Sequence, residues 1–171
     1  AGRLRQFYQI GVEAMGSQSP AVDVEVMTML IEFFCKLGLK DSTLQINSLG
    51  NQNCRPQYRE ILKSAIEKHL DKLCNNCTNR YERNPLRVLD CKAEQCGEIA
   101  KNLPKMIDHL DETSAQHFAE VQQLLDIAKT PYIINTNLVR GLDYYNMTAF
   151  EVTSDNLGAQ NAICGGGRYD T

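Results

Sequence analysis

Apolar side chains recur at helical spacing in several stretches of the chain. In residues 20–40 they return every three or four positions, which predicts a helix with one stripe facing the core. Gly38 follows as the expected C-terminal cap of that helix. Residues 56–73 carry a second apolar face, and helical patterns return in residues 99–110 and 114–128. The two clearest stripes are Val26, Met29, Leu30, Phe33 and Leu37 in the first helix, and Tyr58, Leu62, Ile66 and Leu70 in the second.

Alternating apolar and polar positions predict strands near both ends of the chain. Residues 5–14 alternate loosely and end at the turn-forming sequence GSQSP, which favours a strand there. One face of that strand would carry Phe7, Gln9, Gly11 and Glu13. Buried polar side chains without partners are costly, so we interpret this face as a candidate polar pocket. Residues 42–50 and 131–154 are also strand-like.

The order of these patterns predicts an α+β protein whose strand-bearing core is interrupted by helices. We expect residues 1–50 to form the first part of the core and residues 51–130 to form a helical insertion. Residues 131–171 would then complete the core.

Composition narrows the class of protein. A net charge of −3 argues against bulk electrostatic attraction to nucleic acid, although it leaves room for a local basic patch. The sequence has no apolar run of membrane-spanning length and no apolar signal-peptide core, so we expect a cytoplasmic protein. It also lacks an initiator methionine, and we expect it to begin partway through a longer protein.

Seven cysteines at uneven spacing make a poor disulfide framework and favour reduced thiols. Cys74, Cys77, Cys91 and Cys96 follow the spacing C-x2-C-x13-C-x4-C. Two such pairs can close a tetrahedron of thiolates around a structural zinc ion. The first pair has the usual spacing and the second is looser, so free cysteines remain the alternative.

A further candidate site lies near the C-terminal end of the sequence. Arg140, Gly141, Asp143, Tyr144 and Tyr145 gather in six residues, which suggests a site for an anion and hydrogen-bonding groups. The glycine run 165–167 allows either close approach of a ligand or a tight turn. Near the N-terminus, Arg3 and Arg5 beside Phe7 suit either a nucleotide or a frayed charged end.

Four segments together resemble the histidyl-tRNA synthetases, a family of class II aminoacyl-tRNA synthetases. GRLRQFYQIGVEAMG resembles the loop and second strand of motif 2, and LVRGLDYYNMTAFEV resembles the histidine-specific motif. LGAQNAICGGGRYD resembles the second histidine motif, and NPLRVLDCK a segment of the insertion domain. The resemblance covers essentially the whole chain. It implies a partial class II antiparallel-sheet core with a mostly helical insertion.

The resemblance implies a histidine–tRNA ligase. In that reaction histidine attacks the α-phosphate of ATP, which is bound with Mg²⁺, and the resulting histidyl-adenylate passes its histidyl group to the histidine tRNA. Histidine would be bound by Gln9, Glu13, Arg140, Tyr144, Tyr145 and Tyr169, with Arg140 also catalytic beside the α-phosphate. ATP would be bound by Arg3 and Arg5 at the phosphates and by Phe7 at the adenine.

The family pattern is incomplete in this sequence. Motif 1, which builds the family's dimer interface, is absent, as are motif 3 and the anticodon-binding domain. Met147 stands where Arg is common in the family, and Thr171 where Gly commonly follows. We therefore expect a catalytic fragment with little activity alone and a homodimer in the full-length protein. The insertion would lie over the tRNA acceptor arm.

Two rival functions remain open from the sequence. The first is the non-catalytic paralogue that acts as a regulatory subunit of ATP phosphoribosyltransferase, which should lack the intact RGLDYY string. The second is a zinc-stabilised RNA-binding module formed by residues 51–130 and independent of catalysis.

Overall fold

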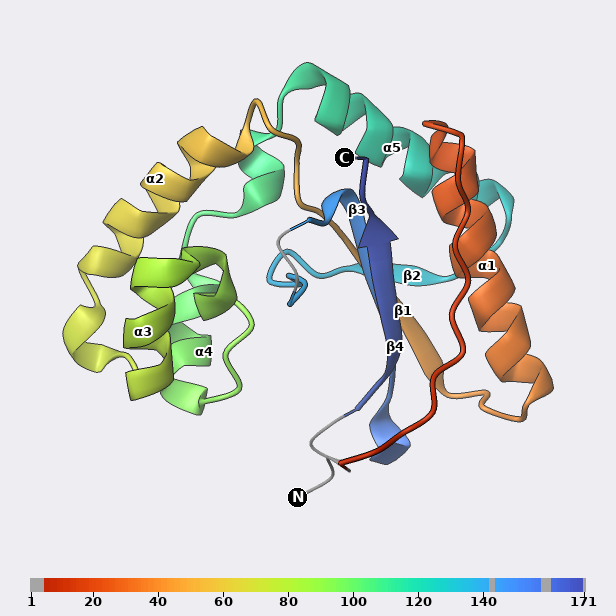
Figure 1. The fold of residues 1–171 in the computed structure, drawn as a ribbon, viewed down its shortest axis with the longest axis horizontal. Coiled ribbons are helices and arrows are strands. Elements are labelled where there is room, and N and C mark those ends of the chain that lie inside the picture. The colour runs from red at the N-terminus through yellow and green to blue at the C-terminus, as the bar shows by residue number, and fades with distance from the viewer. Residues whose placement is uncertain (1–4, 142–143, 158–160, 171) are drawn as a thin grey trace.

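The computed structural model describes residues 5–141, 144–157 and 161–170. Its centre is a four-stranded sheet in the order β2-β1-β3-β4 (Figure 1). β1 (Ser42–Ser48) pairs parallel with β2 (Tyr132–Ile134) and antiparallel with β3 (Asn146–Ser154). β3 pairs antiparallel with β4 (Ala162–Arg168). The mixed, mostly antiparallel sheet confirms the expected α+β class.

Two helices cover one face of this sheet, α1 (Pro20–Lys36) and α5 (Glu112–Ile127) (Figure 1). Each begins at a side-chain cap, with Ser19 accepting from the amide of Ala21 and Asp111 from that of Ser114. They share one core with alternate strand residues, because the pleat of β1 and β3 points every second side chain to this face. That core contains Val24, Met27, Phe34, Leu44, Ile46, Phe118, Val121, Leu125, Phe150 and Val152.

The apolar stripe predicted for the first helix packs in the core only in part, through Val26 and Leu30, which are partly buried against it. α1 buries Val24, Met27 and Phe34, whereas Met29 and Phe33 of the predicted stripe are 43% and 42% exposed. The helix is apolar around much of its circumference, so periodicity alone does not single out the covered side. Its end agrees with the prediction, since Gly38 has φ +88° and its amide bonds to the carbonyl of Cys35.

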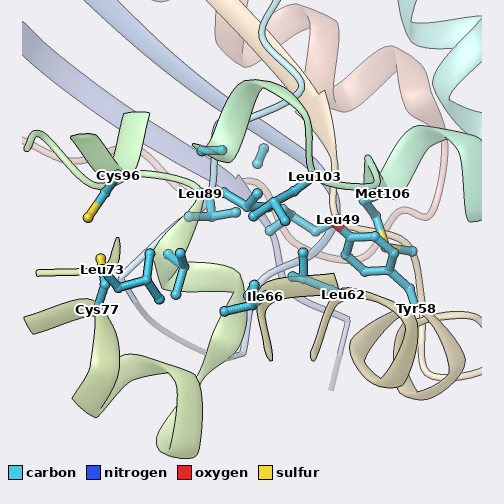
Figure 2. Close-up of a cluster of buried hydrophobic side chains, with 14 of the residues drawn as sticks. Leu49, Tyr58, Leu62, Ile66, Leu73, Cys77, Leu89, Cys96, Leu103 and Met106 are labelled. Carbon is cyan, nitrogen blue, oxygen red and sulfur yellow. The ribbon is translucent and has the colours of Figure 1, made fainter. Parts of the chain in front are cut away.

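The remaining helices form a separate block beside the sheet (Figure 1). It contains α2 (Arg55–Glu67), α3 (Asn75–Arg83) and α4 (Glu94–Lys101). Short 3-10 turns join them at Leu70–Lys72 and Pro85–Val88, and a third, Met106–His109, follows α4. Tyr58, Leu62 and Ile66 point from α2 into the core of the block, as their four-residue spacing predicts (Figure 2).

The core of the sheet and the core of the helical block indicate where the inserted domain ends. The expected 51–130 insertion contains α5, but α5 packs with α1 and the sheet rather than with the helical block. We therefore propose that the inserted unit ends near residue 110 and that α5 belongs to the sheet core. The block is not isolated, because Val139 and Ala149 from the second sheet part lie in its core.

The prediction of a strand in residues 5–14 is wrong for the described part. Residues 5–19 join no strand among the described residues, and their side chains are exposed. A strand needs a hydrogen-bonding partner along its length, and alternation alone does not supply one. The segment instead runs extended beside α1 and the sheet (Figure 1).

The run Gly165–Gly167 lies inside β4 and not in a turn. A Cβ at Gly166 would lie 2.7 Å from Cζ of Phe150. At Gly167 it would lie 2.6 Å from the carbonyl oxygen of Thr148. These glycines therefore allow β4 to approach both a core ring and the neighbouring backbone.

A buried ion pair joins the ends of the sheet core. Nη1 of Arg168 at the end of β4 lies 2.8 Å from Oδ1 of Asp23 in α1. The other carboxylate oxygen of Asp23 accepts from Thr148 in β3 at 2.6 Å and lies 2.9 Å from Nε2 of His117 in α5. Arg168 also donates to the Ser17 carbonyl at 2.7 Å, which fixes the exit of the N-terminal segment. The buried imidazole of His117 therefore has hydrogen-bond partners in both Asp23 and Thr148.

No described helix is both long and apolar enough to cross a membrane.

Replacing Asp23 by Asn should lower the free energy of unfolding by about 3 kcal/mol, because it leaves the Arg168 cation buried with a weaker set of partners. Urea unfolding of the chain measures the effect through the midpoint at unchanged slope. Glu25→Gln, an exposed acid-to-amide change on the same helix, is the matched control and should alter stability by at most about 0.5 kcal/mol. Equal midpoints for the two variants would contradict the role of the pair.

Gly167→Ala should destabilise the sheet by about 1–3 kcal/mol, because the added methyl group meets the β3 backbone and not a movable side-chain end. Gly97→Ala in α4 is the control, since a Cβ there meets nothing within 4 Å. It should raise stability by about 0.5–1 kcal/mol through helix propensity. An unchanged or raised urea midpoint for Gly167→Ala would show that β4 does not need the close approach.

Candidate functional site

Three tyrosine rings meet at one end of the β3–β4 pair. Tyr144 and Tyr145 precede β3, and Tyr169 follows β4. Because the two strands are antiparallel, with Asn146 opposite Arg168, the start of one meets the end of the other. The ring centroids of Tyr144 and Tyr145 are 4.7 Å apart, and Tyr169 lies 5.6 Å and 6.4 Å from them. The fold thus brings together the tyrosines that the sequence predicted for one pocket.

Arg140 lies beside this cluster, in the connection between β2 and β3. Its Cζ is 5.9 Å from the centroid of the Tyr145 ring, and its Nη1 is 3.2 Å from Oε2 of Glu151 in β3. The side chain crosses Gly165, where a Cβ would lie 2.4 Å from Nη1. Gly165 is therefore required for the observed position of the guanidinium. Nε of Arg140 is buried and has no hydrogen-bond partner among the described residues.

Glu13 reaches the cluster from the N-terminal segment. The pKa of the Tyr169 phenol is raised, chiefly because that phenol is hydrogen-bonded to the Glu13 carboxylate. Burial is the main cause of the raised pKa of Tyr145, with a hydrogen bond to Tyr144 adding to it and the Arg140 charge opposing it. Both phenols are therefore neutral hydrogen-bonding groups near pH 7.

A groove of about 1040 Å³ runs from these rings between the N-terminal segment, α1 and β4. Gln9 and Glu13 line it from one side, and Tyr145, Tyr169 and the glycines of β4 line it from the other. The stripe that the sequence assigned to the core faces this groove, through Val26, Met29, Leu30 and Phe33.

The residues predicted to bind ATP do not gather at the groove as the predicted histidine-binding residues do. Phe7 is 67% exposed, and neither Phe7 nor Arg5 lines the groove. Arg3 lies outside the described residues. Tyr144 contacts the other two rings but does not line the groove.

The four predicted cysteines converge at the far end of the helical block. Their sulfur atoms all lie within 4.8 Å of one another, and Sγ of Cys74 is 3.8 Å from Sγ of Cys91. Figure 2 shows the sulfur atoms of Cys77 and Cys96 turned toward each other at one edge of the block's core. The amide of Cys74 also donates to Sγ of Cys96 at 3.3 Å. A backbone hydrogen bond from Cys77 is the main cause that lowers the pKa of Cys74 to about 7, whereas burial raises that of Cys77.

Sequence reasoning missed several residues that build the site. Arg55, at the first position of α2, donates from Nη1 to the carbonyl of Tyr145 at 2.7 Å. Glu151 holds Arg140, and Asp23 holds the end of β4 next to Tyr169. Asp23 and Arg55 contact partners at least 90 residues away, so local patterns contain no signal for these contacts.

The family model of histidyl-tRNA synthetase matches residues 1–171. The histidine–tRNA ligase of Geobacter metallireducens is 54% identical over 169 residues, which are 99% of this chain and 41% of that protein. That of Pelotomaculum thermopropionicum is 52% identical over 170 residues, which are 99% of this chain and 40% of that protein. The crystal structure of apo S. aureus histidyl-tRNA synthetase superposes with a TM-score of 0.68 at 36% identity, over 92% of this chain and 38% of that one.

The chain therefore spans about two fifths of the length of the curated relatives that it matches. The match extends over the sheet core, the helical block and the tyrosine cluster alike, because the family model covers every residue of the sequence. The chain belongs to the histidyl-tRNA synthetase family.

Proposed function

We propose that this chain is the histidine-recognising part of a histidine–tRNA ligase that acts in protein synthesis. The observation that carries the proposal is the meeting of Arg140, Tyr145, Tyr169 and Glu13 at one end of the β3–β4 pair. It combines a cation, two neutral phenols and a carboxylate, as a zwitterionic amino acid with an imidazole side chain requires. The regulatory-subunit alternative is not favoured, because the relatives at about 50% identity are named histidine–tRNA ligases.

In this proposal each group has one task. Glu13 and Gln9 bind the α-ammonium group of histidine, and the phenols of Tyr145 and Tyr169 bind its ring nitrogens, with Tyr144 supporting the rings. A pocket that satisfies polar ring atoms rejects amino acids that lack them. Arg140 contacts the substrate carboxylate, and its Nε, which has no partner within the described part of the chain, is a donor for an anion.

The reaction would then be an in-line displacement at phosphorus. A carboxylate oxygen of histidine attacks the α-phosphate of ATP, and the bond to the β-phosphate breaks with release of pyrophosphate. Arg140 stabilises the negative charge that develops on the α-phosphate. Arg3, Arg5 and Phe7 would contact ATP, and Mg²⁺ bound to the phosphates would offset their charge. The exposure of Phe7 leaves its stacking role to be formed on binding.

The partners follow from the same proposal. The histidyl group passes to the histidine tRNA in the cytoplasm, with the helical block near the acceptor arm. Lys63, Lys68, Lys72, Arg80, Arg83 and Arg87 of this block can contact phosphates. Arg80 and Arg87 already pair with Asp90, so they would contribute less than the lysines. We also propose that the full-length protein is a homodimer.

We further propose that Cys74, Cys77, Cys91 and Cys96 hold a structural zinc ion. A tetrahedron with Zn–S bonds of about 2.3 Å has S···S edges of about 3.8 Å. The 3.8 Å between Cys74 and Cys91 equals that edge and is far longer than a disulfide bond. The cluster joins the start of α3, the turn after Val88 and α4, three short elements that a metal ion would link.

Histidine-dependent exchange between ATP and pyrophosphate tests the proposed function on the longest polypeptide that the gene encodes. With all twenty amino acids assayed side by side, exchange should occur with histidine and stay at background with the others, because only histidine satisfies both phenols and the carboxylate. Exchange with another amino acid, or with none, would refute the proposal.

Zinc should be present at about one ion per chain in freshly purified protein and absent from a Cys77→Ser variant, because three thiolates hold the ion far less tightly than four. Elemental analysis measures the content. Cys35→Ser, a change at an exposed cysteine outside the cluster, should leave the content at about one. Wild-type protein without zinc, or retention of zinc by the Cys77 variant, would exclude this site.

A further inference from the structure

We propose that Arg55 is a positioning residue for histidine recognition, because it fixes the backbone that aims the Tyr145 phenol. The inference rests on the proposed function. Arg55 would not touch the substrate and would act through Tyr145. It belongs to the helical block, so the block would set the geometry of the amino-acid pocket as well as lie near the tRNA.

The first support is the direct contact between the two elements. Arg55 opens α2, and its Nη1 donates to the main-chain carbonyl of Tyr145 at 2.7 Å in a partly buried setting. A hydrogen bond from a guanidinium is charge-assisted and short, and it is stronger than a neutral one. The helix anchors the guanidinium, so the carbonyl is held against a rigid element.

The second support is the backbone that follows Tyr145. The pairing of β3 with β4 shifts register between Asn146 and Ala149. Within this shift Met147 has φ +46°, a backbone conformation that residues other than glycine rarely adopt. Bulges of this kind redirect neighbouring side chains. The strained residue is held by the entry to the helical block, since the Met147 amide donates to Gly50 at 2.8 Å and the Met147 carbonyl accepts from Leu49 at 2.7 Å.

The third support is packing. The Tyr145 ring packs against the core of the helical block, which also contains Val139 and Ala149 on either side of it in sequence. On its other side the ring faces Arg140 and Tyr169. Tyr145 therefore lies between the block and the candidate pocket, and its carbonyl, its strand and its ring all contact the block.

The test is histidine-dependent pyrophosphate exchange on the longest polypeptide that the gene encodes. Arg55→Ala should raise KM for histidine by about 10- to 100-fold, the loss expected for one hydrogen bond to a charged group. KM for ATP should stay within about twofold of wild type. Arg55→Lys retains a cationic donor and should restore part of the loss. Arg59→Ala removes an arginine one turn along the same helix, whose contact to Arg83 is exposed, and should match wild type.

A double-mutant cycle distinguishes positioning from general destabilisation. If Arg55 acts through Tyr145, the KM effects of Arg55→Ala and Tyr145→Phe should be strongly non-additive. Additive effects, or equal increases in KM for histidine and ATP, would overturn the inference. So would an Arg55→Ala variant that behaves as Arg59→Ala does.

Amide hydrogen exchange gives a readout that does not need activity. Arg55→Ala should accelerate exchange at the Met147 amide relative to Arg59→Ala, because the bulge loses one of its anchors. Unchanged exchange there would refute the positioning role. If wild-type protein shows no histidine-dependent activity, the proposed function fails, and this measurement still decides whether Arg55 holds the strand.

Discussion

The buried pair between Asp23 and Arg168 is the interaction on which the sheet core depends. A guanidinium and a carboxylate with side chains 7% and 10% exposed cost much desolvation, and only dense hydrogen bonding offsets that cost. Here the pair is satisfied by Thr148, His117, Asp170 and the carbonyl of Ser17. These partners come from α5, β3, the residues after β4 and the N-terminal segment, so one charge pair fixes the relative position of elements that apolar packing alone would let slide.

The tyrosine cluster lies between two sets of contacts that anchor it. On one side, the pair holds Arg168, and the next residue in the chain is Tyr169. On the other side, Arg55 and the entry to the helical block hold the chain around Tyr145. The two anchors come from different cores, yet the rings they carry are 6.4 Å apart at their centroids. The pocket geometry thus depends on the docking of the helical block against the sheet, and the shared residues Val139 and Ala149 provide that docking.

How far the sequence predicts this arrangement depends on whether a contact is local. The helices with one clear apolar face, α2 and α5, and the strand with Leu44 and Ile46 were predicted, because their periodicity is a property of the chain itself. The strand predicted in residues 5–14 was wrong, because alternation does not reveal whether a strand has a partner. The stripe of α1 was right only for Val26 and Leu30, because periodicity identifies an apolar side without showing how much of it is covered. Gly165–Gly167 admitted two interpretations until the structure showed that Arg140, Phe150 and the β3 backbone occupy the space. The tyrosines and Glu13 could be predicted as a group only through the family motifs, whereas Arg55 and Asp23, with partners at least 90 residues away, could not be predicted at all.

The cysteine cluster is linked to the same pocket by a short path. The segment between Cys77 and Cys91 carries Arg80, Arg87 and Asp90, in which the single carboxylate pairs with both guanidiniums at 3.3 Å and 3.1 Å. Arg87 extends from this group to the histidine motif, where a Cβ at Gly141 would lie 3.1 Å from its Nη1. Gly141 adjoins Arg140, so the segment that carries Arg87 lies close to the residue proposed to stabilise the α-phosphate. The path is polar and runs beside Val88 and Leu89, which are buried in the core of the block, and Asp90 directly precedes Cys91. A closed set of four thiolates would therefore stiffen the pocket through Asp90 and Arg87, and the Tyr145 ring would gain a second support independent of Arg55.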